Sequence, residues 1–134
     1  MRIWHTALIS VLPKDQLVAQ WRELSAIAGA IQKNGTPNHI LVNFVLDYDY
    51  DHFISYAHYL RAEMTRRGYR TMNSVWDKIT ALKPDYTILP FEDIYKEKMN
   101  FEYLKICYYN LYEKYLSGGI KEEDWEKIRT ILEE

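Results

Sequence analysis

The chain is short of the residue types that define several large classes of protein. Its 134 residues include one cysteine, five glycines and four prolines. A lone cysteine, Cys107, can form neither an internal disulfide nor a cysteine zinc cluster, so a disulfide scaffold is excluded and a reducing, cytoplasmic location is expected. The low glycine and proline content excludes collagenous and low-complexity architectures. What remains is one globular domain over residues 1–134, in which 48% apolar residues suffice for a core.

Long apolar runs are also absent. The most apolar stretch, residues 39–46, is far shorter than the ~20 residues that a membrane span needs. The N-terminus carries one arginine followed at once by Trp4 and His5, which fits neither a signal peptide nor a transit peptide. We therefore expect no membrane partner.

Positive charge is scarce for a nucleic-acid-binding protein. Lys and Arg number 17 against 19 Asp and Glu, a net charge of −2. Residues 1–33 carry a net +2, residues 34–90 are balanced, and residues 91–134 carry a net −4 (seven basic residues against eleven acidic ones). Non-specific nucleic-acid binders are usually basic, so the composition weakens this function class. It does not exclude the class, because the negative charge lies in the last third and could face away from a phosphate-binding surface.

Hydrophobic periodicity predicts helices along most of the chain. A helix over residues 13–33 begins at Pro13 and stops at Asn34-Gly35, with Glu23 on the flank of its apolar stripe. A second helix follows an acidic cluster and ends before Gly68. The two predicted apolar stripes are Leu17, Trp21, Leu24, Ala28 and Ile31 in the first helix, and Phe53, Ala57, Leu60 and Met64 in the second.

The remaining segments are predicted with less regular signals. Residues 39–46 are apolar and β-branched enough for a strand, but a buried extended connector fits equally well because no partner strand is visible. Short helices are expected around residues 74–82, with Ser74 as N-cap, and over 121–133. Residues 91–116 are expected to be helical, with a fresh start at Asn100. The fold class is all-α: a small, single-domain helical bundle.

Metal-binding patterns are weak. Asp47, Asp49 and Asp51 are spaced like the opening of a calcium loop, but His52 stands where that loop needs glycine and His58 where it needs glutamate. A charge cluster at a helix N-terminus is the better interpretation. The four histidines show no zinc spacing. We expect no metal and no cofactor.

Three other features have two interpretations each. Cys107 lies on an apolar helix face, which favours a buried inert thiol over a nucleophile. Five tyrosines between residues 103 and 115 are either core residues with hydroxyls at the surface or platforms for base stacking; the acidic surroundings favour the first. The last feature is a basic group that fits a phosphate patch and a solvated helix end equally well, and its members are Arg61, Arg66, Arg67 and Arg70.

The first third of the chain resembles a known family. Residues 1–10 (MRIWHTALIS) lead into residues 16–24 (QLVAQWREL), followed by Gly29-Ala30 and Lys33. An Arg-Ile pair at the N-terminus, a helix with aromatic-Arg-Glu-Leu, and Gly-Ala followed by Lys resemble the pyrimidine-dimer DNA glycosylase family (phage endonuclease V-like). The resemblance extends well over roughly residues 1–70.

This resemblance implies a DNA repair glycosylase with abasic-site lyase activity on damaged double-stranded DNA, in which the N-terminal α-amine forms an imine with the sugar. An α-amine has a reference pKa of about 7.7–8.0 against about 10.4 for lysine, so far more of it is neutral and nucleophilic near pH 7. Arg2 is too bulky for the usual methionine removal, so we expect Met1 to remain and to supply the nucleophile. The resemblance assigns the supporting carboxylate to Glu23. It assigns DNA contacts to Arg2, Gln16, Arg22 and Lys33.

A non-catalytic alternative stays open from the sequence. The chain could be a nucleic-acid-binding or protein-binding module that keeps the family scaffold. Spacing alone places Glu23 on a helix flank, where a surface pair with a neighbouring Arg or Lys is the simplest role; the resemblance favours the catalytic one. An extended N-terminus that threads between helices and brings Met1 near Glu23 is the expectation on which the enzyme hypothesis depends.

Overall fold

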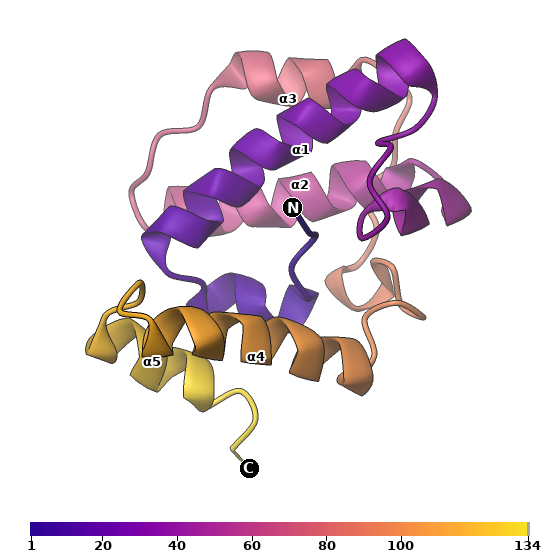
Figure 1. Ribbon diagram of the computed structural model, residues 1–134. Helices are drawn as coiled ribbons and strands as arrows, with labels where there is room; N and C mark the ends of the chain where they lie inside the picture. The colour runs from indigo at the N-terminus through magenta and orange to yellow at the C-terminus, as the bar shows by residue number, and fades with distance from the viewer. Residues whose placement is uncertain (134) are drawn as a thin grey trace.

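The computed structural model describes residues 1–133 and contains helices but no β-strand in that range (Figure 1). The predicted all-α class is therefore confirmed. In chain order the elements are the 3-10 helix η1 (Thr6–Val11), α1 (Lys14–Asn34), the 3-10 helix η2 (Asn43–Asp47), α2 (Asp51–Arg66), α3 (Asn73–Thr80), the 3-10 helix η3 (Phe91–Asp93), α4 (Phe101–Leu116) and α5 (Glu122–Arg129). Over the same residues, none of the helices combines the length and the hydropathy that crossing a bilayer requires.

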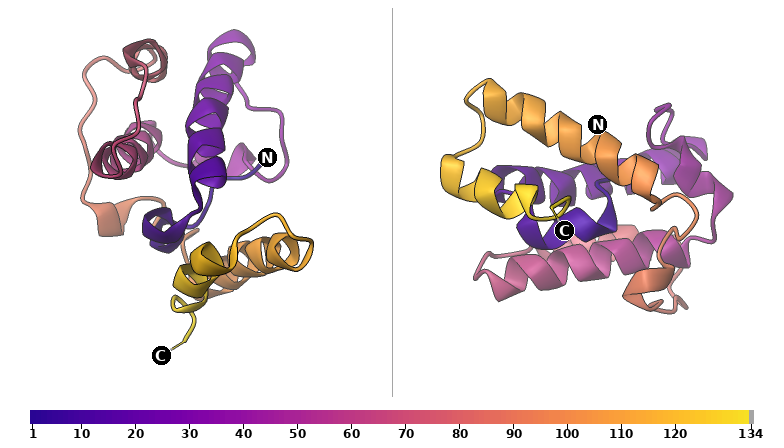
Figure 2. Two further views of the ribbon diagram at one scale, coloured as in Figure 1. Left: turned by 90° about the vertical axis from the view of Figure 1, so that its left-hand side faces the viewer. Right: turned by 90° about the horizontal axis from the view of Figure 1, so that it is seen from below.

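The helices form two groups joined by η1. Helix α1 packs on both α2 and α3, and α4 packs on α5 (Figure 2). The short η1 contacts α2 on one side and α5 on the other, so it lies between the groups. Its residues Leu8 and Ile9 are buried in the common core. The bundle is therefore held together through the first twelve residues of the chain.

The two longest predictions from periodicity are confirmed. In α1 the stripe residues Leu17 to Ala28 are buried, and the helix ends at Gly35, whose φ of 76° suits glycine. The Gly35 N–H donates to the Ile31 carbonyl at 2.8 Å, which completes the last turn. All four stripe residues of α2 are buried as well, and Gly68 follows its end with a φ of 83°.

Residues 39–46 are neither a strand nor an extended connector, so that prediction is wrong. The Asn43 side chain accepts a hydrogen bond from the His39 N–H at 2.9 Å, which closes a turn leading into η2. Within this segment Val42 and Val45 are buried, whereas Ile40 is 89% exposed. A local side-chain-to-backbone bond thus replaced the strand pairing for which no partner exists.

Three helix boundaries differ from the sequence prediction. Helix α4 begins at Phe101 and Asn100 caps it by accepting the Tyr103 N–H at 2.8 Å, as predicted, but residues 91–100 form η3 and turns instead of helix. Tyr95 has a φ of 49°, which an α-helix does not allow. Helix α3 begins at Asn73, so Ser74 lies inside it and is not its N-cap. Helix α5 is shorter than the predicted range 121–133, although it buries Trp125 and Ile128.

Candidate active site at the amino terminus

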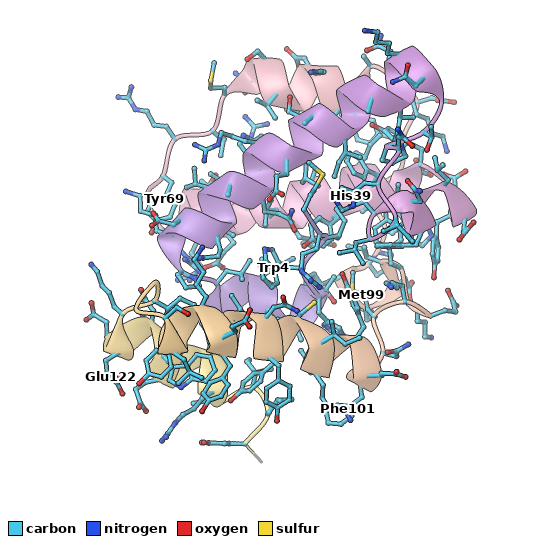
Figure 3. All side chains as sticks on the ribbon, in the orientation of Figure 1. Trp4, His39, Tyr69, Met99, Phe101 and Glu122 are labelled. Atoms are coloured by element: carbon cyan, nitrogen blue, oxygen red, sulfur yellow. The ribbon has the colours of Figure 1, made fainter. Side chains whose placement is uncertain are left out.

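The first residues run between helices, as expected. Trp4 lies in the space between α1 and α4, with the N-terminus on the same side of the molecule (Figures 1 and 3). Ile3 is fully buried and Trp4 is half-buried, whereas Met1 remains 48% exposed. The chain therefore enters the protein directly after its first residue.

Three consecutive carbonyl groups hold this segment, each bonded to a different helix. The carbonyl of residue 2 accepts a hydrogen bond from Gln20 Nε2 of α1 at 2.9 Å. The carbonyl of residue 3 accepts one from the Tyr103 hydroxyl of α4. The carbonyl of residue 4 accepts one from the Tyr56 hydroxyl of α2 at 2.6 Å. Because all three donors are buried, water does not compete for these bonds and the segment has a fixed position.

Glu23 is half-buried on α1 beside the amino terminus. Burial raises the pKa of its carboxyl group, while the positive charges of the N-terminal amine, Arg22 and His39 act in the opposite direction. The amine and the carboxylate therefore interact electrostatically, although no ion pair within 4.0 Å joins them. Met1 and Glu23 therefore lie near one another, without an ion pair between the two charged groups. In such an arrangement the carboxylate can stabilise a cation formed on the amine or accept a proton near it.

The four residues expected to contact DNA differ in exposure. Arg22 and Lys33 are exposed, and neither takes part in an ion pair within residues 1–133. The guanidinium of Arg2 lies 5.7 Å from the centre of the Trp4 ring and also faces the Tyr103 hydroxyl. Gln16 is buried, and its Oε1 atom has no hydrogen-bond partner.

An open hollow of about 500 Å³ lies beside this site. Trp4 and Gln16 form one wall, and the C-terminal half of α4, including Asn110 and Lys114, forms the other. Glu113 and Lys114 both line it, so the hollow carries charges of both signs. The chain therefore reaches this hollow at Trp4, three residues after the amino terminus.

The residues that hold the segment were not found from the sequence. Periodicity assigns no role to Gln20 or Tyr56, and it identifies Tyr103 only as one of five tyrosines on a helix. One signal existed: a tyrosine on a buried face needs a partner for its hydroxyl, and an extended segment offers free carbonyls. The sequence does not say which carbonyl each hydroxyl reaches.

The structure decides the interpretation of Cys107 and part of the interpretation of the tyrosines and of the basic group. Cys107 is fully buried, and burial raises the pKa of its thiol, so the prediction of an inert thiol is confirmed. Of the five tyrosines, Tyr103 is buried and Tyr115 stacks on Trp125 with ring centres 4.9 Å apart, whereas Tyr109 and Tyr112 are exposed, so the prediction of core residues is confirmed only in part. In the basic group, Arg66 and Arg67 are bonded to Glu63 and Arg61 to Thr71 and Asn73, whereas Arg70 is exposed.

Metal-ligating side chains do not gather in this part of the molecule. Within the described residues, no group of three or more His, Cys, Asp or Glu side chains is placed to hold a metal ion. The Asp49 carboxylate instead accepts a hydrogen bond from the Asp51 N–H at 2.9 Å, at the start of α2. Lys83 pairs with both aspartates, at 2.9 and 3.1 Å.

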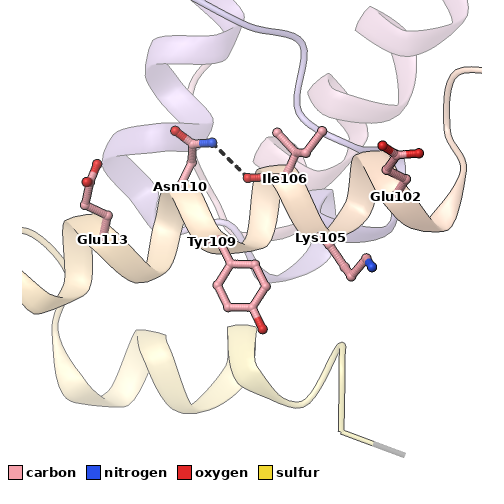
Figure 4. Close-up of a pocket in the computed structure, with 6 residues that line it drawn as sticks. All are labelled: Glu102, Lys105, Ile106, Tyr109, Asn110 and Glu113. Carbon is pink, nitrogen blue, oxygen red and sulfur yellow. Dashed lines mark hydrogen bonds between the residues drawn. The ribbon is translucent and has the colours of Figure 1, made fainter.

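A second hollow, of about 540 Å³, lies on the outer face of α4 (Figure 4). Its side chains come from that one helix and are Glu102, Lys105, Ile106, Tyr109, Asn110 and Glu113. The Asn110 side chain donates to the Ile106 carbonyl at 2.8 Å, so this amide is already occupied. None of the predicted catalytic or DNA-binding residues lines this surface.

One comparison with known proteins gave a match. A family model described as pyrimidine dimer DNA glycosylase matches residues 1–77, more than half of the chain. The matched range contains η1, α1, α2 and the first part of α3, and both Met1 and Glu23 fall within it. Searches of curated proteins and of solved structures gave no match.

Proposed function

Since the chain belongs to the pyrimidine dimer DNA glycosylase family, we propose that it excises damaged pyrimidines from double-stranded DNA, with the α-amine of Met1 as nucleophile, and then cleaves the abasic strand. A DNA substrate follows from the family. The nucleophile, the carboxylate and the lyase step are the parts of the proposal that the resemblance implies and that the experiment below tests.

The reaction proceeds through an imine. The neutral amine attacks the sugar C1′, a new N–C1′ bond forms, and the bond from C1′ to the base breaks as the base leaves. The nitrogen then gives up a proton, the C1′–O4′ bond breaks with O4′ taking a proton, and the opened sugar is left as the cationic imine. At a site that has already lost its base, the amine adds to the sugar aldehyde and water leaves. Glu23 stabilises the cationic imine and accepts the C2′ proton, after which the C3′–O bond breaks and the 3′ phosphate departs.

One observation carries this proposal: the chain is bonded through the carbonyls of residues 2, 3 and 4 while Met1 remains half-exposed next to Glu23. These bonds fix the backbone directly behind the amine, so the amine has a defined position relative to the helix that carries Glu23. Burial also raises the pKa of Glu23, which makes its carboxylate a stronger proton acceptor than an exposed one.

Two exposed cations supply a path for the DNA backbone. Arg22 and Lys33 are eleven residues apart on α1, which places them on the same side of the helix and roughly 16 Å apart along its axis. Because neither has an acidic partner in residues 1–133, both are available for phosphates. Gln16 lines the hollow next to Trp4, Arg2 lies beside the Trp4 ring, and these two residues complete the proposed contact set.

The test is covalent trapping. The protein with a free N-terminus is incubated with a duplex that contains one abasic site, in the presence of borohydride, which reduces the imine to a stable amine. We expect a cross-linked protein–DNA band whose attachment maps to Met1 by mass spectrometry. Glu23→Gln should still bind the duplex but lose most strand cleavage. Glu123→Gln, which changes an exposed carboxylate on α5, is the matched control and should leave cleavage unchanged.

The result also separates the enzyme from a binding module. A duplex that binds with no trapped adduct and no cleavage would favour the non-catalytic alternative. An adduct that maps to a lysine would overturn the assignment of Met1 while leaving the lyase activity in place.

A further inference from the structure

An extended segment surrounded by helices has a specific problem. Its backbone N–H and C=O groups need partners, but the backbone groups of neighbouring helices are already bonded within those helices. In a β-sheet a neighbouring strand would supply the partners. Here residues 2–4 are buried or half-buried, and no strand lies beside them in the described part of the chain. Side chains must therefore supply the hydrogen-bond partners.

Gln20 supplies both kinds of partner at once. Its Nε2 donates to the Arg2 carbonyl at 2.9 Å and its Oε1 accepts the Trp4 N–H at 2.8 Å. One residue in a parallel strand bonds its neighbour in the same way, donating to one residue and accepting from the residue two positions later. The side-chain amide of Gln20 therefore takes the place of a strand.

Tyr56 lies against this amide. Its hydroxyl is 2.6 Å from the Trp4 carbonyl and 3.0 Å from the Gln20 Oε1 atom, and its one proton is shared between these two acceptors. Gln20 and Tyr56 are both fully buried, so rotating the amide would break bonds that water could not replace. The amide therefore has one stable orientation.

The position of Gln20 on α1 connects it to the reaction. Glu23 follows three residues later, about 4.5 Å further along the same helix axis. One turn of α1 thus holds both the backbone behind the amine and the carboxylate beside it. Small errors in the distance between reacting groups cost large factors in rate, so a shared rigid support matters for chemistry.

We propose that Gln20 is a positioning residue that sets the place of the reactive α-amine relative to Glu23, an inference that rests on the function proposed above. It does not touch the substrate. Its action is on the backbone of residues 2–4, and through it on the amine one residue earlier.

The first experiment compares two glutamines on the same helix. Gln20→Met keeps the side-chain length but removes both bonds to the segment; Gln32→Met is the matched control at an exposed position. We expect the rate of borohydride trapping on a pre-bound abasic duplex to fall roughly ten- to hundredfold in Gln20→Met, and to stay unchanged in Gln32→Met. The dissociation constant for the duplex should change less than about threefold, because the phosphate-binding cations are untouched. Equal losses of binding and trapping would indicate a merely structural role and overturn the proposal.

The second experiment uses pH. In Gln20→Glu an ionised carboxylate accepts from Trp4 but cannot donate to the Arg2 carbonyl, whereas a protonated carboxyl can do both. The ratio of trapping rates, variant to wild type, should therefore rise as the pH is lowered from 8 to 5. A ratio that does not change with pH contradicts the inference.

Two controls keep the outcomes distinct. Tyr56→Phe removes only one hydroxyl and replaces Gln20→Met in the experiment if Gln20→Met fails to fold. We expect it to reduce the rate of trapping by less than Gln20→Met. If the wild type forms no adduct, the proposed function and this inference fall together. If the wild type forms the adduct and both Gln20→Met and Tyr56→Phe form it at the wild-type rate, only the inference is wrong.

Discussion

Arg67 donates a hydrogen bond of 2.6 Å from its Nε atom to Glu63, one turn earlier on α2. The same guanidinium donates to the Leu12 carbonyl at 2.7 Å, just before α1. The pair therefore ties the end of α2 to the turn between η1 and α1. Arg66 bonds the same carboxylate from the solvent side.

Removing the charge of Glu63 should destabilise the protein. Desolvation alone would raise its pKa, but the hydrogen bonds and charges of Arg66 and Arg67 outweigh it and hold the pKa below its ordinary value. The stabilisation by ionised Glu63 is thus fully present above pH 4.5, the ordinary pKa of a glutamate side chain. It is lost as the pH falls through the lowered pKa of the folded state. For Glu63→Gln we expect the free energy of unfolding to drop by about 1–2 kcal/mol at pH 7, measured by urea denaturation. An undiminished difference from wild type at pH 2 would contradict this account.

Glu23→Gln should have the opposite effect on stability. Burial raises the pKa of Glu23, so the folded state holds its proton more tightly than the unfolded chain does. Ionisation of Glu23 therefore lowers the free energy of unfolding at every pH above its raised pKa. This loss vanishes below pH 4.5, the ordinary pKa of a glutamate side chain. We expect the uncharged variant to melt a few degrees higher than wild type at pH 7 and at the same temperature at pH 3. A variant that is less stable at pH 7 would show that the carboxylate is held by an ion pair after all.

Two histidines should make the fold sensitive to mild acid. The Nδ1 atoms of His5 and His52 accept the backbone N–H of Ala7 and Tyr95, each at 3.0 Å, and burial lowers the pKa of both rings. Because the unfolded chain binds these protons more readily, stability rises with pH up to about 6.5 and is lost below it. Melting curves between pH 7 and pH 5 should therefore show a shallower decline for His52→Gln than for wild type. His58→Gln, at an exposed position, should decline as steeply as wild type.

The salt dependence of DNA binding tests the assignment of Arg22 and Lys33. Each phosphate contact contributes about 0.9 to the slope of log K against log salt concentration. We expect Arg22→Gln and Lys33→Gln each to reduce the slope by about one, measured by fluorescence anisotropy with an undamaged duplex. Arg129→Gln is the control because this arginine, the last residue of α5, is already paired with Glu126 and with Glu133 beyond the helix. A variant that weakens binding while the slope stays the same would rule out a phosphate contact for that residue.

Local signals were enough to predict the long helices. Apolar periodicity gave the buried stripes of α1 and α2, and the left-handed Gly35 and Gly68 ended both helices as expected. The Asn100 cap was also predictable, because an asparagine side chain satisfies an N–H that the first turn leaves free. Interactions within a few residues decide all of these features.

The errors arose where a local bond competes with propensity. The residues around Asn43 are strand-like in composition, but its side chain closes a turn that composition does not reveal. Tyr95 is a large buried aromatic with a left-handed φ, held by its bond to His52 from α2. No pattern in its own neighbours predicts that conformation.

The site required tertiary contacts that no spacing rule provides. The family resemblance identified Met1 and Glu23 as a candidate pair. The bonds behind Met1 join residues that are 18, 52 and 100 positions apart in sequence, to Gln20, Tyr56 and Tyr103. Pairings at such distances follow from the packing of α1, α2 and α4, which a single sequence does not specify.

The hydrogen bonds that hold residues 2–4 also make the position of the α-amine depend on chain length. They bind the main chain and do not involve the side chain of Met1, so replacing Met1 by another residue would leave the α-amine nitrogen in the same place. One additional residue in front would carry that nitrogen as much as about 3.6 Å outward, roughly the width of a non-bonded contact. The position of the α-amine therefore depends on how many residues precede Arg2, and not on which residue stands at position 1.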